Sequence, residues 1–259
     1  MVWLSNKIGR DDLNPGDHIY TWRRGYYYSH HGIYGHDGRV IHLTRGPGRD
    51  GFSSSSSHPS DGPVLSSTLE EFLSGRGLRR FQYGVNAIKF LIKRAGTCTL
   101  AFSDPPEDVL RRASFLLTYG SGDYDLSNNN CEDFALYCRT ELLDLKGTRK
   151  TGKSGQIASF VAAITTIFAY IIMPHGFLPT GFTGLSLMYW YFNYSIRLHF
   201  DAVSRVSYVL ERVEVEEFRQ LSCTESKSAL YWYKFDSHPS YIGSHSLVFY
   251  SREHNSSMD

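Results

Sequence analysis

"NNNCEDFALYC", residues 128–138, is the stretch that decides the fold. Cys131 follows three asparagines and opens a run with apolar residues at helical spacing, which continues as far as Gly147. Asparagine is a favoured helix N-cap and glycine a favoured stop, so we expect a helix from Cys131 to Gly147. A helix N-terminus lowers the pKa of a thiol. The stretch therefore allows two interpretations, a reactive thiol at a helix start or a small apolar residue in the core.

A reactive thiol needs an imidazole partner, and the candidate histidines lie in an earlier segment. The runs HIYTW and YYYSHHGIYGHDGRVIHLT favour β-strands joined by a short glycine-containing loop. His30 and His42 are 12 residues apart (42 minus 30), and an even spacing keeps both on one face of a sheet. Two such imidazoles could act as base and orienting partner for Cys131, as in cysteine–histidine–asparagine sites. We expect His31 and His36 to be turn or surface residues.

Composition excludes some classes of protein. The chain has 259 residues, with 27 Lys and Arg against 26 Asp and Glu, so it lacks the basic field expected of a nucleic-acid-binding protein. The start, MVWLSNKIGRDDLNPGD, is polar where a secretory signal would be apolar. The four cysteines form no CxxC pair. We therefore expect free thiols in a reducing, cytosol-facing compartment, with Cys98, Cys138 and Cys223 as packing residues.

Capping and turn patterns predict further elements along the chain. STLEEFLSG reads as a short helix capped by Ser67 or Thr68, and SDPPEDVLRRASFLLTYG as a longer helix capped by Ser103 or Asp104. RRFQYG and GTCTLAFS are strand candidates, and DAVSRVSYVLERVEVEEF is expected to be helical. The Gly-, Ser- and Pro-rich residues 45–63 are expected to form a flexible loop.

Residues 154–196 contain no Asp, Glu, Lys or Arg. Their first part, Ile157 to Met173, has 17 residues, which as a helix gives roughly 25 Å, near the lower limit for crossing a bilayer. Pro174 and Pro179 interrupt the stretch, so we expect a short span or a re-entrant hairpin, with a buried core helix as the alternative.

A basic cluster, Lys146, Arg149, Lys150 and Lys153, precedes the apolar stretch and predicts that the residues before 154 face the cytosol. The same segment spells GTRKTGKS, which matches the phosphate-binding loop pattern. It follows a predicted helix rather than a strand, so we interpret it as a basic collar beside a membrane.

Three motifs together indicate a family. "NPGDHIY", "HHGIYGHDGRVIHL" and "NNCEDFALYC" resemble, in this order, the lecithin:retinol acyltransferase (LRAT)-like family within the NlpC/P60 papain-like superfamily, and are most similar to its plant members with an LRAT-like (NC) domain. The resemblance covers about residues 13–150. It implies an α+β, circularly permuted papain-like fold with an antiparallel sheet and a nucleophile at a helix N-terminus. The family's two histidines fall on His30 and His42, and its nucleophile falls on Cys131.

The resemblance also implies an activity. It predicts a thiol-dependent acyltransferase or phospholipase-like enzyme that acts on membrane glycerolipid through a Cys131 thioester, passes the acyl group to an unidentified acceptor, and needs no metal or other cofactor. The alternatives are a catalytically inactive, membrane-tethered interaction module and a papain-like amide or peptide hydrolase. Animal members usually carry His where this chain has Asp133, and Glu132 and Asp133 should oppose thiolate formation.

We therefore expect three parts: an LRAT-like catalytic domain at 13–150, a hydrophobic membrane-associated segment at 154–196, and a charged helix with an irregular tail at 197–259.

Overall fold

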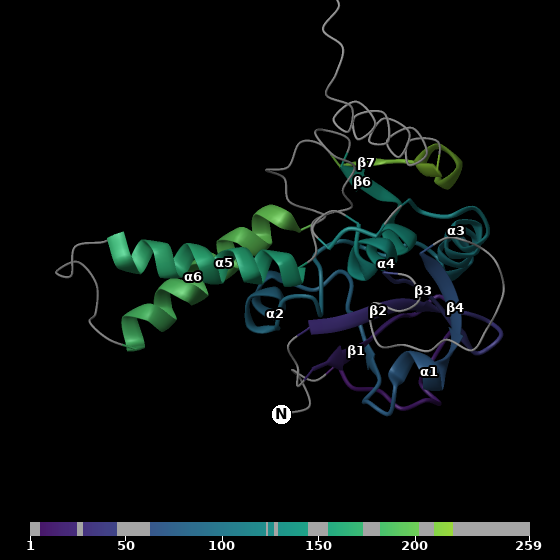
Figure 1. Ribbon diagram of the computed structural model, residues 1–259, viewed down its shortest axis with the longest axis horizontal. Coiled ribbons are helices and arrows are strands. Elements are labelled where there is room, and N and C mark those ends of the chain that lie inside the picture. The colour runs from purple at the N-terminus through teal and green to yellow at the C-terminus, as the bar shows by residue number, and fades with distance from the viewer. Residues whose placement is uncertain are drawn as a thin grey trace, which may run out of the picture.

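A five-stranded antiparallel sheet organises the fold (Figure 1). The computed structural model describes residues 6–24, 28–45, 63–122, 124–126, 129–144, 155–172, 182–201 and 210–219. The strand order is β4-β3-β2-β1-β5, with β1 at His18–Arg23, β2 at Tyr28–Tyr34, β3 at Arg39–Leu43, β4 at Val64–Thr68 and β5 at Arg79–Arg80. The predicted hairpin of β2 and β3 is confirmed, as is the strand at HIYTW.

Helices cover both faces of the sheet (Figure 1). On one face lie α3 (Pro106–Tyr119) and α4 (Cys131–Thr140), and on the other α1 (Leu69–Leu73). Strand side chains alternate accordingly: Ile41 and Leu43 pack toward α4, whereas Val40 packs toward α1. His42 lies on the α1 side with Val40, beside Phe72.

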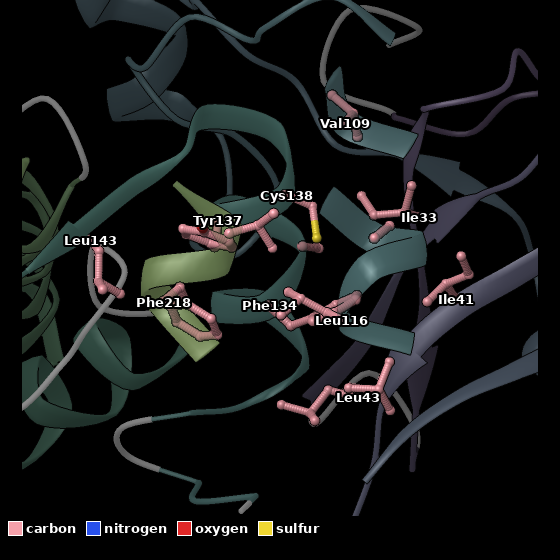
Figure 2. Close-up of a cluster of buried hydrophobic side chains, with 14 of the residues drawn as sticks. Ile33, Ile41, Leu43, Val109, Leu116, Phe134, Tyr137, Cys138, Leu143 and Phe218 are labelled. Atoms are coloured by element: carbon pink, nitrogen blue, oxygen red, sulfur yellow. The ribbon is translucent and has the colours of Figure 1, made fainter. Parts of the chain in front are cut away.

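The larger core fills the space between the sheet and the helices α3 and α4 (Figure 2). Phe134, Cys138 and Leu116 meet the strand residue Ile33 there, and Figure 2 shows these side chains converging between helix and sheet. Cys138 is completely buried, which confirms its predicted role as a packing residue. Since α4 is fastened along this core, its first residue is held against the sheet.

Two helix caps follow the sequence prediction and one does not. Thr68 caps α1 in a capping box with Glu71, and Asn130 caps α4. Helix α3 instead starts after Pro105 without a side-chain cap. Asp104, one of the expected caps, binds the buried guanidinium of Arg112 at 2.6 Å instead.

The structure differs from the sequence prediction at the end of α4 and around residue 210. Helix α4 ends at Thr140, with Glu141 at φ 60°, and does not continue to Gly147. The strand β6 (Leu142–Asp144) follows and pairs with β7 (Leu210–Arg212), a segment predicted to be helical. The ion pairs of Arg112 and Arg212 with Glu141 hold this junction, so tertiary contacts outweigh the local helical pattern.

Two smaller strand predictions also change. RRFQYG contributes only the two residues of β5, and GTCTLAFS forms no strand but touches Gln82 through an isolated bridge at Cys98. A short helix, α2 (Ala87–Ile92), lies between these segments.

Helices α5 (Gly155–Ile172) and α6 (Phe182–Phe200) pack on each other and extend away from the sheet (Figure 1). Ala158, Ala162 and Thr166 are the buried residues of α5. Many large apolar side chains of this pair are exposed, among them Phe160, Ile164, Ile167, Phe168, Ile171, Ile172, Phe182, Leu187, Trp190 and Tyr191. By length and composition α5 is a candidate membrane span, and only 17% of it is buried, so it is not a core helix.

The base of this apolar hairpin, as we call α5 and α6, is fastened to the rest of the molecule. Arg197 near the end of α6 is buried and donates to the backbone oxygens of Phe90 and Lys93 at 3.0 and 2.8 Å. Asp201 accepts from the Thr99 hydroxyl at 2.9 Å. Residues 46–62, the basic cluster with its GTRKTGKS sequence, Cys223 and the tail after 219 lie outside the described residues.

A substitution at Gly32 in β2 would test how closely β2 and β3 pack. An added Cβ would lie 2.6 Å from Val40 Cγ1 and 3.1 Å from His42 Cβ, so Gly32→Ala must displace β3. We expect a loss of about 1–3 kcal/mol in the free energy of unfolding, measured by urea titration. Gly77→Ala is the control, because its new methyl would meet only the flexible end of Arg79. Equal stabilities of the two variants would contradict this packing.

Candidate active site

Cys131 is the first residue of α4, and its environment begins with the helix cap. The Asn130 side chain accepts from the backbone N–H groups of Glu132 and Asp133 at 2.8 and 3.2 Å. The Asp133 carboxylate in turn accepts from the Asn130 N–H at 3.1 Å. The N-cap predicted from the asparagine run is therefore confirmed at Asn130, while Asn128 lies outside the described residues. The cap accepts from the N–H groups that follow Cys131, and the N–H of Cys131 itself favours a charged sulfur.

The sulfur of Cys131 lies at an opening between β2 and β3. These strands pair only at Ile33↔Ile41 and Tyr34↔Val40, so the earlier part of β2 has no partner on that side. Tyr34 donates its N–H to Asp17 on the β1 side, and backbone groups alternate in direction along a strand. The N–H and C=O groups of Ser29 and His31 therefore point into the opening.

Cys131 and Gln156 occupy this opening. The Cys131 sulfur lies 3.9 Å from the Ser29 carbonyl oxygen, and the His31 N–H also faces it. The Ser29 N–H donates to Gln156 Oε1 at 2.7 Å. These contacts satisfy strand groups that would otherwise be buried without partners. They also place the sulfur at the level of His30, which lies between the two contacted residues.

His30 and His42 form the predicted imidazole pair. Their nitrogens Nε2 and Nδ1 are 3.0 Å apart, and His42 Nε2 lies 2.9 Å from the Ser67 hydroxyl. Both rings pack against Phe72 of α1, with centroid distances of 5.2 and 5.5 Å. His30 is half-buried whereas His42 is 2% exposed. The even spacing therefore predicted the pairing, and His30 is the member that solvent can reach.

A second imidazole pair, which the sequence reasoning missed, lies on the α4 face. His31 Nδ1 is 2.8 Å from His18 Nε2, and His18 Nδ1 is 2.8 Å from the Tyr83 hydroxyl. His31 is completely buried, so its expected place in a turn or on the surface is wrong. Strand alternation explains the difference, because residues 30 and 31 must face opposite sides of β2. His36 is exposed in the turn, as expected.

The thiol is not acidified by its helix position. Burial, together with the neighbouring carboxylates of Glu132 and Asp133, raises the pKa of Cys131 to about 12. The N–H groups of His31 and of Cys131 itself act in the opposite direction but are outweighed. The expected lowering of this pKa is therefore wrong, although the opposing effect of the two acids is confirmed. At neutral pH the sulfur carries its proton and needs a base to remove it.

The four buried or half-buried imidazoles are neutral at neutral pH. Burial lowers the pKa of His31 and of His42 to about 4, and it holds the pKa of His18 and of His30 well below 6.5. Close imidazole neighbours add to the lowering for His18 and His30. A neutral imidazole has one unprotonated nitrogen, so His30 is able to accept a proton from a thiol. In the part of the chain that the structure describes, no group of three His, Cys, Asp or Glu residues is arranged to hold a metal ion.

Several residues around the site carry no clear signal in the sequence. His18 and Tyr83 join the second imidazole pair, and Ser67 fixes His42 from the adjacent strand. Gln156 lies at the start of a long apolar run, where only its polarity marks it as unusual. Strand register could have suggested His18, because its place in β1 faces β2 near His31. The position of Gln156 depends on how α5 docks, which local patterns do not encode.

Comparisons with known proteins agree with this architecture. Residues 11–144 match the family described as Lecithin retinol acyltransferase. The chain is 48% identical over 207 residues to Protein LEAD-SENSITIVE 1 of Arabidopsis thaliana, an alignment that covers 72% of this chain and 79% of that protein. No solved structure matches.

The buried neutral histidines predict how stability depends on pH. When the pH falls from about 6.5 toward 4, the unfolded chain takes up protons that folded His31 and His42 do not bind. Stability contributed by these residues is therefore present above pH 6.5 and is lost as the pH falls, by about 1.4 kcal/mol per pH unit for each histidine. Urea unfolding at a series of pH values measures this slope. His31→Gln should reduce the slope by one proton, and an unchanged slope in that variant would contradict the assignment.

Proposed function

Because the chain belongs to the lecithin retinol acyltransferase family, we propose that it is a thiol-dependent acyltransferase or phospholipase-like enzyme with Cys131 as nucleophile. His30 is the proposed base, and His42 is the proposed partner that orients it. The observation that supports this proposal is the opening beside β2, where the Cys131 sulfur contacts Ser29, the residue before His30, while His42 Nδ1 lies 3.0 Å from His30 Nε2.

We propose the tautomers that let His30 act as a base. In these, His30 Nε2–H donates to His42 Nδ1 across 3.0 Å, and His42 Nε2–H donates to the Ser67 hydroxyl across 2.9 Å. His30 Nδ1 is then unprotonated and able to accept the thiol proton. This arrangement parallels other sites in which a third group orients the base of a nucleophile.

The proposed reaction has two halves. His30 Nδ1 takes the proton of Cys131 while the sulfur attacks an acyl carbonyl carbon of a glycerolipid, and the Cys131 N–H stabilises the oxyanion. The ester C–O bond then breaks, and the leaving alcohol takes the proton from His30. In the second half an alcohol, amine or water gives a proton to His30 and attacks the thioester carbon. The C–S bond then breaks, and the sulfur takes the proton from His30 and returns to its thiol form.

The proposed setting is the cytosolic face of a membrane. The exposed apolar surface of α5 and α6 suits a lipid environment, and the basic residues before 154 suit an anionic leaflet on the cytosolic side. The domain division at 13–150, 154–196 and 197–259 stays part of this proposal. So does circular permutation, which the chain order of two strand histidines before the helical cysteine supports.

The first test is trapping of the acyl intermediate. Incubation with labelled phosphatidylcholine should give a hydroxylamine-labile acyl adduct on Cys131, detected by mass spectrometry and absent from Cys131→Ala. His30→Ala should slow formation of this adduct by several orders of magnitude, because the buried thiol holds its proton at neutral pH. His36→Ala, on the exposed turn of the same hairpin, is the control.

The same experiment separates the alternatives. An adduct that forms only with peptide or amide substrates would favour a papain-like hydrolase. No adduct with any acyl donor, together with unchanged membrane binding of Cys131→Ala, would favour an inactive interaction module. A rate for His30→Ala within a few-fold of wild type would reject His30 as the base.

A second test concerns the membrane. Ile167 and Phe168 are both more than half exposed on α5, so replacing both with lysine places two charges on the face proposed to meet lipid. We expect a large loss of co-sedimentation with phosphatidylcholine–phosphatidylserine vesicles. Replacing Ile88 and Ile92 on α2, which are similarly exposed but lie outside the hairpin, is the control. Equal losses for the two pairs would argue against the hairpin as the lipid-binding element.

A further inference from the structure

The apolar hairpin begins inside the candidate active site. Gln156, in the first turn of α5, reaches the same strand residue that the Cys131 sulfur contacts. Its Oε1 accepts from the Ser29 N–H at 2.7 Å, and its Nε2 donates to the Ser29 carbonyl oxygen at 3.2 Å. The side chain thus pairs with the unpaired edge of β2 as a neighbouring strand would.

The same amide also binds the first turn of α4. Gln156 Nε2 lies 3.1 Å from Glu132 Oε2, and the Gly155 N–H donates to Glu132 Oε1 at 3.0 Å. Glu132 directly follows Cys131 and is 1% exposed. The Gln156 side chain therefore links β2, which the sulfur contacts, to α4, which carries the sulfur.

Gln156 links this network to the second imidazole pair. Its Nε2 lies 3.3 Å from His31 Nε2, which also lies 2.8 Å from the Ser29 hydroxyl. Since Oε1 accepts from a backbone N–H, the orientation of the amide is fixed, and Nε2 faces a carbonyl, a carboxylate and an imidazole. The Ser29 carbonyl and the Glu132 carboxylate accept the two amide hydrogens, which leaves little freedom for the side chain.

Close backbone packing fixes the point from which Gln156 projects. A Cβ added at Gly155 would lie 2.5 Å from the Gly96 nitrogen, and one added at Gly96 would lie 2.6 Å from Gln156 Cγ. The two glycines therefore allow the start of α5 to approach the segment before Cys98. Together with buried Arg197 at the end of α6, this contact makes the hairpin base part of the domain.

We infer that Gln156 is a positioning residue for Cys131, so that the apolar hairpin is a working part of the catalytic site and not a detachable anchor. For acyl transfer the inference rests on the proposed function. Gln156 keeps the edge of β2 open to the sulfur and holds the first turn of α4 through Glu132. Without it, the Ser29 carbonyl and the Glu132 carboxylate lose a shared donor, and the sulfur loses its fixed place beside the strand.

The test compares Gln156→Ala with Ser159→Ala in the full chain. Ser159 lies one turn along α5 and binds Asn193 of α6 at 2.8 Å, so its loss perturbs the hairpin away from the site. For Gln156→Ala we expect kcat for thioester formation from labelled phosphatidylcholine to fall about 10- to 100-fold with KM little changed, since misplacement of a reacting group reduces rate more than binding. Ser159→Ala should match wild type.

A second readout does not depend on acyl transfer. Alkylation of Cys131 by iodoacetamide, followed by mass spectrometry from pH 6 to 10, should show a changed rate and pH profile in Gln156→Ala. Cys138, buried in the core two turns along α4, provides an internal control in the same samples. If wild type forms no acyl adduct, the proposed function fails, but the alkylation comparison still decides the role of Gln156.

If Gln156→Ala unfolds, the isosteric variant Gln156→Glu takes its place in the comparison. It keeps the reach of the side chain, removes the Nε2 donor and places a second carboxylate against Glu132, so the alkylation profile should move to higher pH. Rates and profiles of a folded Gln156 variant equal to those of Ser159→Ala would overturn the inference.

Discussion

The site depends on the backbone pairing that the first part of β2 does not make with β3. Strands β2 and β3 pair only near their shared turn, and the preceding backbone groups of β2 face an opening instead of a neighbour. Buried backbone groups need hydrogen-bond partners. The edge of β2 therefore contacts a thiol at the start of α4 and binds a side-chain amide at the start of α5. The opening thus brings β2 together with two segments that lie 102 and 127 residues further along the chain.

Burial keeps both the thiol and the imidazoles of this site neutral. Taking a thiol and several imidazoles out of water raises the pKa of the sulfur and lowers the pKa of the rings, so neither forms an ion at neutral pH. A preformed thiolate–imidazolium pair is therefore not the ground state in this structure. The proposed chemistry moves the proton during attack, and the hydrogen bonds from His30 through His42 to Ser67 prepare the ring for it.

The sequence predicted those features that follow from local period and capping. The pairing of His30 with His42 follows from strand alternation, and the asparagine cap before Cys131 follows from the needs of a helix start. The failures arise where long-range contacts decide. Helix α4 stops at Thr140 because Glu141 is held by Arg112 and Arg212, and residues near 210 form a strand because β6 offers an edge. The pKa of Cys131 is raised and not lowered because burial, a tertiary property, outweighs the effect of the helix position.

The proposed chemistry requires the Cys131 sulfur and the His30 ring to meet at the opening beside β2. An experimental structure of the full chain at high resolution measures the distance between Cys131 Sγ and His30 Nδ1 most directly. We expect a separation within about 3–4 Å, the reach of a base beside its nucleophile, with His42 on the other ring nitrogen. A His30 ring turned wholly into the α1 face, with another side chain between it and the sulfur, would contradict the proposed role of His30.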